Sequence, residues 1–295
     1  TDKDEKMSSA TKQKGEPKRF IRTPIKGTKY TIMVSSAKGG VGKSTFAVNL
    51  AFAFKNLGKK VGILDADIFG PSLPKLIGKS MKPETENGKS IIPIDSHGIQ
   101  CMSMGFLVEE TTPMIWRGPM VISAIKTLTE KVLWKDRDYI IVDMPPGTGD
   151  TQLTFAQDIM VDGAIIISTP QDIALLDVKR GIQMFDKTKI NIIGLVDNMS
   201  FFKGDDGKEY NIFGEGGVEK TAKEFNKEFL GKIPLHLELG TASDKGEPLT
   251  HSNPEHEISL IFKKIAKLIL IKLENDTKWE SGLTMCWKKR SEYFR

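Results

Sequence analysis

A glycine-rich loop that carries two lysines is the segment of this chain best suited to chemistry. Residues 38–45 read Lys-Gly-Gly-Val-Gly-Lys-Ser-Thr, between the apolar run 30–34 and the helix-forming segment 46–54. Glycines let successive backbone N–H groups point at one anion, and the following helix adds the positive end of its dipole. Lys43 would reach the β- and γ-phosphates of a nucleotide, while the Ser44 hydroxyl would complete the shell of a Mg²⁺ ion. The loop therefore predicts a triphosphate site, and a glycine-rich turn without a ligand is the alternative.

The loop departs from the usual phosphate-loop pattern at its start. Ala37 stands where that pattern has glycine, and Lys38 follows as an extra lysine. In this respect the loop resembles the deviant Walker A group, which includes the nitrogenase iron protein, partition ATPases and arsenite-pump ATPases. The resemblance implies that Lys38 crosses a dimer interface to the partner's nucleotide. The residues expected to contact nucleotide are Ala37, Lys38, Gly39, Gly40, Val41, Gly42, Lys43, Ser44 and Thr45.

Three aspartates end predicted strands beside this loop. Asp65 and Asp67 close one strand, and Asp143 closes another. Carboxylates in such places serve a metal ion and a water molecule, so we expect Asp143 to bind Mg²⁺, directly or through water, and Asp67 to orient the attacking water. The alternative is that these aspartates cap helices or turns. The glycine-rich segment 145–149 is the expected switch that changes shape when the γ-phosphate leaves.

Hydrolysis of a γ-phosphate depends on positioning and charge stabilisation more than on covalent help. Lys38 from a second copy would act as an arginine finger does, so the expected catalytic residues are Lys38, Lys43 and Asp67. Asn198 follows a strand where its amide could both donate to and accept from a purine edge. Adenine is favoured over guanine because the chain has no Asn-Lys-x-Asp stretch.

The composition indicates one large domain without a specialised surface. With 295 residues and 39% apolar content, the chain can bury a full core. A net charge of +5 is mild, so we expect no nucleic-acid partner and no stable membrane association. Cys101 and Cys286 stand in no paired spacing, which favours a reducing, cytoplasmic setting. We expect a flexible leader over 1–29, an ATPase domain over 30–274 and an extension of unknown role over 275–295.

From residue 30 onward, short β-branched runs alternate with helical segments, which predicts an α/β fold with a doubly wound, mainly parallel sheet and helices on both faces. Residues 88–104 suggest two antiparallel strands around a tight turn. Residues 255–273 form a basic amphipathic pattern, either a helix that covers the sheet or one that lies on a membrane surface. The candidate strands are 31–35, 61–65, 139–143, 164–168, 192–196 and 229–233.

Five separated strings make the resemblance more specific. They resemble, in order and spacing over about residues 30–273, the Mrp/ApbC branch of the deviant Walker ATPases. This resemblance implies an ATP-dependent homodimer that carries or scaffolds iron–sulfur clusters for apoproteins, with Pro234 joining Asn198 in the nucleotide site. The strings begin at Asp65 (Asp-Ala-Asp-Ile-Phe-Gly-Pro-Ser), Trp116 (Trp-Arg-Gly-Pro-Met), Asp143 (Asp-Met-Pro-Pro-Gly-Thr-Gly-Asp), Val196 (Val-Asp-Asn-Met-Ser) and Gly231 (Gly-Lys-Ile-Pro-Leu).

The chain departs from that branch in two respects. Many members carry a Cys-x-x-Cys pair soon after the fourth string, whereas residues 201–210 contain no cysteine. Because iron sites of this class use thiolate ligands, the usual dimer-bridging cluster cannot be built from that segment. Many bacterial relatives also have a small domain before the ATPase core, whereas 29 residues precede the predicted ATPase domain here.

The leading hypothesis is therefore a Mg²⁺-dependent, homodimeric ATPase that assists iron–sulfur protein maturation. Two rivals remain open at this stage. One is a positioning ATPase of the septum-site or partition type, which would act on a membrane or DNA surface. The other is a regulator that binds ATP without turning it over.

Overall fold

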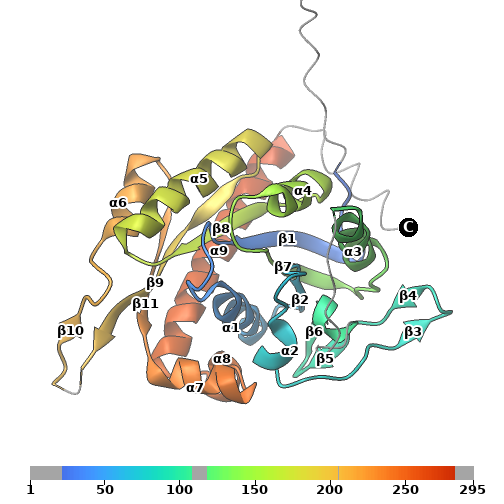
Figure 1. Ribbon diagram of the computed structural model, residues 1–295, viewed down its shortest axis with the longest axis horizontal. Coiled ribbons are helices and arrows are strands. Elements are labelled where there is room, and N and C mark those ends of the chain that lie inside the picture. The colour runs from blue at the N-terminus through green and yellow to red at the C-terminus, as the bar shows by residue number, and fades with distance from the viewer. Residues whose placement is uncertain (1–21, 108–117, 205, 283–295) are drawn as a thin grey trace, which may run out of the picture.

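The computed structural model describes residues 22–107, 118–204 and 206–282, which build one α/β unit around a central sheet (Figure 1). Within this part of the chain the sheet has nine strands, seven of them in parallel pairings, with β10 and β5 antiparallel at the two ends of the order. The order is β10-β9-β8-β1-β7-β2-β6-β5, and β11 also pairs with β9. The strands are β1 (Thr28–Ser35), β2 (Val61–Asp65), β5 (Ile94–Ser96), β6 (Ile99–Ser103), β7 (Arg137–Asp143), β8 (Gly163–Ser168), β9 (Ile192–Lys203), β10 (Glu209–Tyr210) and β11 (Phe229–Leu235).

Helices cover both faces of the sheet, as the doubly wound prediction requires (Figure 1). One layer contains α1 (Lys43–Asn56), α2 (Leu73–Leu76), α7 (Leu237–Lys245), α8 (Leu249–Ser252) and α9 (Glu257–Gly282). The other contains α3 (Gly118–Glu130), α4 (Asp150–Asp158), α5 (Asp172–Thr188) and α6 (Gly217–Glu224). Every residue of β2 and of β8 is buried, because strands covered on both faces have no solvent side. The predicted fold class is confirmed.

All six candidate strands are present, with differences at their ends. The longest difference is at β9, which continues seven residues past the predicted end and pairs with β10. The antiparallel hairpin within 88–104 is also present, as β5 and β6 around His97 and Gly98, which both have positive φ. It is not separate from the main sheet, because β6 also pairs in parallel with β2. A further two-stranded hairpin, β3 (Thr85–Glu86) with β4 (Ser90–Ile91), stands apart.

The last described helix, α9, covers the sheet. Its apolar residues Ile258, Phe262, Ile265 and Ile269 are buried in the core layer that also contains α1. The helix runs to Gly282, past the end at 273 that the amphipathic pattern suggested. None of the described helices combines the length and the apolar character needed to cross a membrane.

Some expectations fall on segments beyond the described residues. Most of the expected leader, Trp116 and Arg117 of the second string, and Cys286 belong to these segments. The described end of the leader is packed: Ile25 is buried, and Thr23 forms an isolated bridge with Ile159.

Candidate functional site

The phosphate loop joins the carboxyl end of β1 to the amino end of α1, where the sequence placed it (Figure 1). Gly40 and Gly42 both have φ of 80°, a conformation that favours glycine. Gly42 is the N-cap residue of α1, and no side chain caps the helix there. The first amides of a helix have no intrahelical acceptor, so this end of α1 presents N–H donors that an anionic phosphate group fits.

Lys43, at the start of α1, forms a buried ion pair with Asp143 at the end of β7. Only 6% of the Lys43 side chain is exposed, and its Nζ lies 3.4 Å from Ser44 Oγ. The sequence predicted that these three residues share one site. In the structure β1 and β7 are parallel neighbours, so their carboxyl ends meet at the same edge of the sheet. Carboxylate and hydroxyl oxygens are the donors that Mg²⁺ prefers, so Asp143 and Ser44 fit the ion.

Asp65 anchors the loop that carries Asp67. The Asp65 carboxylate accepts from the amides of Ser72 and Leu73 at 3.0 Å each, and from Ser103 Oγ at 3.0 Å. Its other oxygen accepts from the Asp67 amide at 3.1 Å. Burial, with nearby Asp143, raises the pKa of Asp65. Asp65 therefore follows the alternative interpretation: it holds a turn.

Asp67 lies half-buried at the same edge of the sheet, and its Oδ1 accepts from the Gly70 amide at 3.3 Å. Burial raises the pKa of Asp67, and the charge of Lys43 opposes that shift. The carboxylate lines a cleft of about 160 Å³ whose other wall is formed by Pro145, Pro146 and the start of α4. The Asp67 carboxylate therefore faces segment 145–149 across this cleft, and these two segments would flank the terminal phosphate.

Asn198 contacts the phosphate loop directly. Its Nδ2 donates to the Val41 carbonyl at 2.8 Å, and a Cβ on Gly42 would lie 2.4 Å from the same nitrogen. The next residue, Met199, has φ of 53° within β9, a strained conformation for a side-chain-bearing residue. Pro234 lies on β11, where its neighbour Ile233 pairs with Asn198. The structure thus places Asn198 against the loop and Pro234 on the strand next to Asn198. Their contact with nucleotide stays a prediction.

Lys38 is exposed at the mouth of the loop. Its carbonyl accepts from Ser36 Oγ at 2.8 Å, and no ion pair joins its ammonium group to another described residue. The side chain is therefore available to a group outside this chain, as the predicted role requires. That role itself stays a prediction.

Two buried polar residues, one on α4 and one on β9, were absent from the predicted site. Gln152, in the first turn of α4, donates through Nε2 to Ser35 Oγ. Asp197 is 1% exposed, and neither of its carboxylate oxygens has a hydrogen-bond partner in the described part of the chain. Burial raises the pKa of Asp197 to about 7, with Lys232 opposing and Glu219 adding to the shift. The sequence could have pointed to Asp197, because this charged residue directly follows the apolar run 192–196 of a predicted strand.

The cysteine within the described residues, Cys101, belongs to the core. It is 1% exposed in β6, its Sγ lies 3.6 Å from the Ile99 carbonyl, and burial raises the pKa of its thiol. No group of three or more His, Cys, Asp and Glu residues in the described ranges is arranged to hold a metal ion. Cys101 is therefore a buried core residue and no ligand of the phosphate site.

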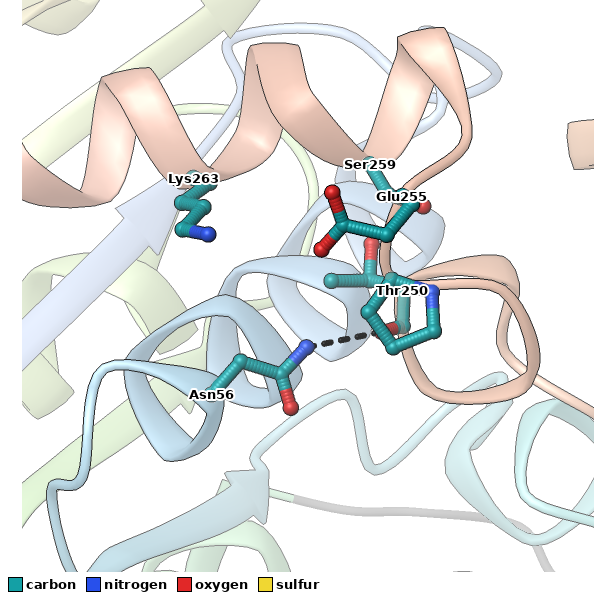
Figure 2. Close-up of a pocket in the computed structure, with 6 residues that line it drawn as sticks. Asn56, Thr250, Glu255, Ser259 and Lys263 are labelled. Carbon is teal, nitrogen blue, oxygen red and sulfur yellow. Dashed lines mark hydrogen bonds between the residues drawn. The ribbon is translucent and has the colours of Figure 1, made fainter.

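A separate cavity of about 250 Å³ lies at the opposite end of α1 from the phosphate loop (Figure 2). There Asn56 Nδ2 donates to the Thr250 carbonyl at 2.9 Å, and Glu255 and Lys263 point toward the same space. None of the predicted site residues lines this cavity. It plays no part in the phosphate site.

Comparison with known proteins agrees with this geometry. The model of the ParA-type family described as NUBPL iron-transfer P-loop NTPase matches residues 27–270. The chain belongs to this family. It is 48% identical over 259 residues to the iron-sulfur cluster carrier protein of Escherichia coli strain K12, a match that covers 87% of this chain and 70% of the relative. It is 46% identical over 265 residues to the mouse iron-sulfur cluster transfer protein NUBPL, covering 89% of this chain and 82% of the relative.

Solved structures support the nucleotide-binding fold. A nucleotide-binding protein from Archaeoglobus fulgidus, solved in complex with ADP, is 37% identical with a TM-score of 0.67, and the match covers 75% of this chain and 88% of that one. The cell division ATPase MinD of Pyrococcus furiosus is 20% identical with a TM-score of 0.60, covering 81% and 98% of the two chains. The second likeness shows the fold alone.

Proposed function

We propose that this chain hydrolyses ATP in a Mg²⁺-dependent reaction, as a homodimer, and that this cycle serves the delivery of iron–sulfur clusters to apoproteins. The observation that carries the hydrolysis proposal is the placement of Lys43, Ser44 and Asp143 together at the uncapped start of α1. The relatives' names, iron-sulfur cluster carrier and transfer proteins, support the biological role.

In this proposal the amides of the phosphate loop and Lys43 hold the β- and γ-phosphates. Phosphate oxygens would compete with Asp143 for Lys43, because the ammonium group can form an ion pair with either anion. Asp143 and Ser44 would then be free to hold Mg²⁺, which when bound neutralises charge on the phosphates. Asn198 and Pro234 would flank the adenine.

Asp67 and Lys38 supply the remaining functions. Asp67 orients the attacking water from the cleft between its own loop and segment 145–149. Lys38, exposed and unpaired with any described residue, reaches the γ-phosphate of a second copy and stabilises the charge that develops there. The proposed catalytic unit is therefore the dimer.

The cluster is cargo in this proposal. The described cysteine is buried in β6, and segment 201–210 contains no cysteine, so the ligands differ from a Cys-x-x-Cys pair after β9. Anaerobic reconstitution with iron and sulfide tests this point through visible absorbance and iron per dimer. We expect no stoichiometric cluster that depends on Cys101; stable iron that is lost in Cys101→Ser would contradict the expectation.

Hydrolysis is tested by phosphate release from the chain with ATP and Mg²⁺, comparing Lys38→Ala with the parent. A residue that stabilises transferred charge from a partner is worth about 10³- to 10⁵-fold in turnover. We therefore expect Lys38→Ala to lower kcat by about 10³-fold while calorimetry still detects nucleotide binding. Lys126→Ala, an exposed lysine on α3, is the matched control. Equal turnover in Lys38→Ala and the parent would reject the role of Lys38.

A positioning ATPase that acts on membranes or DNA is the second candidate class, and no described feature favours it. Most apolar residues of α9 are buried against the core, with Leu260, Leu268 and Ile271 exposed, and the likeness to MinD extends to the fold alone. ATP-dependent co-sedimentation with anionic vesicles would favour that class over cluster delivery.

A further inference from the structure

The segment that follows β7 is fastened to the strand end that leads into the phosphate loop. The Met144 amide donates to the Val34 carbonyl at 3.0 Å, and the Gly147 amide donates to the Ser36 carbonyl at 2.9 Å. A third bond, from Gln152 Nε2 to Ser35 Oγ, involves side chains. Residues 34–36 thus have three ties to residues 144–152, and the phosphate loop begins immediately after them.

The third tie differs from the other two because substitution can remove it. Gln152 and Ser35 are 1% and 2% exposed, and they lie 117 residues apart in the chain. The amide uses its donor on Ser35, but Gln152 Oε1 has no hydrogen-bond partner among the described residues. A buried polar atom without a partner destabilises the structure in which it is found. Gln152 Oε1 can therefore accept a hydrogen bond from a donor that moves next to it when the surrounding loops change conformation.

Gln152 also occupies the right place to sense such a change. It lies in the first turn of α4, directly after the predicted switch at 145–149, and it lines the same cleft as Asp67. Gly147, inside the switch, has φ of 94° and open space where a Cβ would lie, so the segment can change its backbone shape at low cost. A movement of 145–149 would therefore act on Ser35 through Gln152.

We propose that Gln152 is a positioning residue that couples the switch segment 145–149 to the phosphate loop through Ser35. In this proposal it acts through Ser35 and not on the reacting atoms. Its bond makes the two loops change conformation together when the terminal phosphate is lost. This inference rests on the proposed hydrolysis of ATP, and it assigns a function to a residue that the phosphate-loop pattern does not include.

The test compares Gln152→Leu, which removes the amide, with Gln152→Glu, whose oxygens can still accept from the Ser35 hydroxyl. Gln157→Leu, on the same helix but outside the cleft, is the matched control. For each variant we would measure nucleotide affinity, single-turnover hydrolysis and hydrogen exchange with ADP and with a non-hydrolysable ATP analogue. Substitution of a residue that only packs would change affinity and turnover together.

We expect Gln152→Leu to bind nucleotide within about threefold of the parent and to lose about tenfold or more in turnover, the scale of one misplaced catalytic group. At 34–36, the residues before the phosphate loop, exchange should differ less between ADP and the analogue than it does in the parent, while the difference at 145–149 remains. Gln152→Glu should recover part of both properties. If Gln152→Leu does not fold, Ser35→Ala carries the same expectation from the other end of the bond.

The outcomes separate this inference from the proposed function. A parent that hydrolyses no ATP contradicts the proposed function, and the exchange measurements with bound nucleotides still decide the coupling. An active parent whose Gln152→Leu variant keeps both parental turnover and the parental exchange difference at 34–36 overturns the coupling. A variant that loses affinity and turnover in equal proportion overturns it as well, because that result indicates a structural brace.

Discussion

At the scale of single residues, the site is dominated by buried charges that compensate one another. Lys43 and Asp143 are both almost fully buried, and each neutralises the other in this structure. Removing one partner of such a pair leaves an unpaired buried charge at a cost of about 3–5 kcal/mol. Nucleotide with its metal ion offers each of them a new partner of the required sign. Binding can therefore exchange this ion pair without leaving either charge unpaired.

Asp197 is the exception, because its carboxylate has no described hydrogen-bond partner and the charge of Lys232 only partly offsets the effect of burial. This predicts a pH effect on stability. The carboxyl has an ordinary pKa of 3.8, and burial raises the pKa of the folded state to about 7. Below about pH 4 the carboxyl is protonated in both states and has no effect. Between those values the unfolded chain releases the proton while the folded chain keeps it, so stability falls as pH rises. Above about pH 7 the full penalty is present.

We therefore expect Asp197→Asn to raise the free energy of unfolding by about 1–3 kcal/mol at pH 8 and to change it little at pH 4. Urea unfolding at both pH values measures the difference. Asp206→Asn is the control, because Asp206 is a surface carboxylate whose bonds to the Lys208 amide and Tyr210 hydroxyl lower its pKa. A destabilised Asp197→Asn at pH 8 would show that the ionised carboxylate has a partner in solution.

At the scale of elements, the site depends on short connections between strand ends and helix starts. The sequence was sufficient for the main strands, because runs such as β2 and β8 are apolar on both faces and bounded by turn residues. The sequence also predicted that Lys43, Ser44 and Asp143 lie close together, because parallel strands align their carboxyl ends. Individual side-chain contacts between distant segments could not be predicted from the sequence, because they depend on the exact register of strands and helices. The contact of Asn198 with Val41 and that of Gln152 with Ser35 join residues more than 100 positions apart through single side-chain atoms.

The close approach of β9 to the phosphate loop predicts the effect of a methyl group at Gly42. Gly42 and Gly58 share φ near 80°, so Gly→Ala at either position costs about 1 kcal/mol in backbone strain. At Gly42 the new Cβ would also lie 2.4 Å from Asn198 Nδ2, whereas at Gly58 nothing lies within 4 Å. We expect Gly42→Ala to weaken ATP binding by about tenfold or more, the scale of one lost hydrogen bond from the loop to a charged phosphate. Gly58→Ala, at the end of α1, should lower the melting temperature and leave nucleotide affinity unchanged in calorimetry. Equal affinity in both variants would contradict the contact.

At the scale of the whole molecule, the residues proposed for catalysis gather at one edge of the sheet. The phosphate loop, the Asp67 loop and the segment 145–149 all follow the carboxyl ends of neighbouring strands β1, β2 and β7. Lys38 is exposed at this edge and has no described partner within its own chain. A two-fold dimer that joins these edges would place each Lys38 at the other chain's phosphates, so each site would be complete only in the dimer.

Mixing two inactive variants tests this arrangement most directly. Lys38→Ala keeps Asp67, and Asp67→Ala keeps Lys38; in a mixed dimer, the first chain's site has its own Asp67 and receives Lys38 from the second chain. Each variant alone should release phosphate at about 1% of the parental rate or less. An equal mixture should recover about a quarter of the parental rate, because half of the dimers are mixed and one of their two sites is complete. A mixture whose rate equals the average of the two separate variants would contradict the action of Lys38 across the dimer.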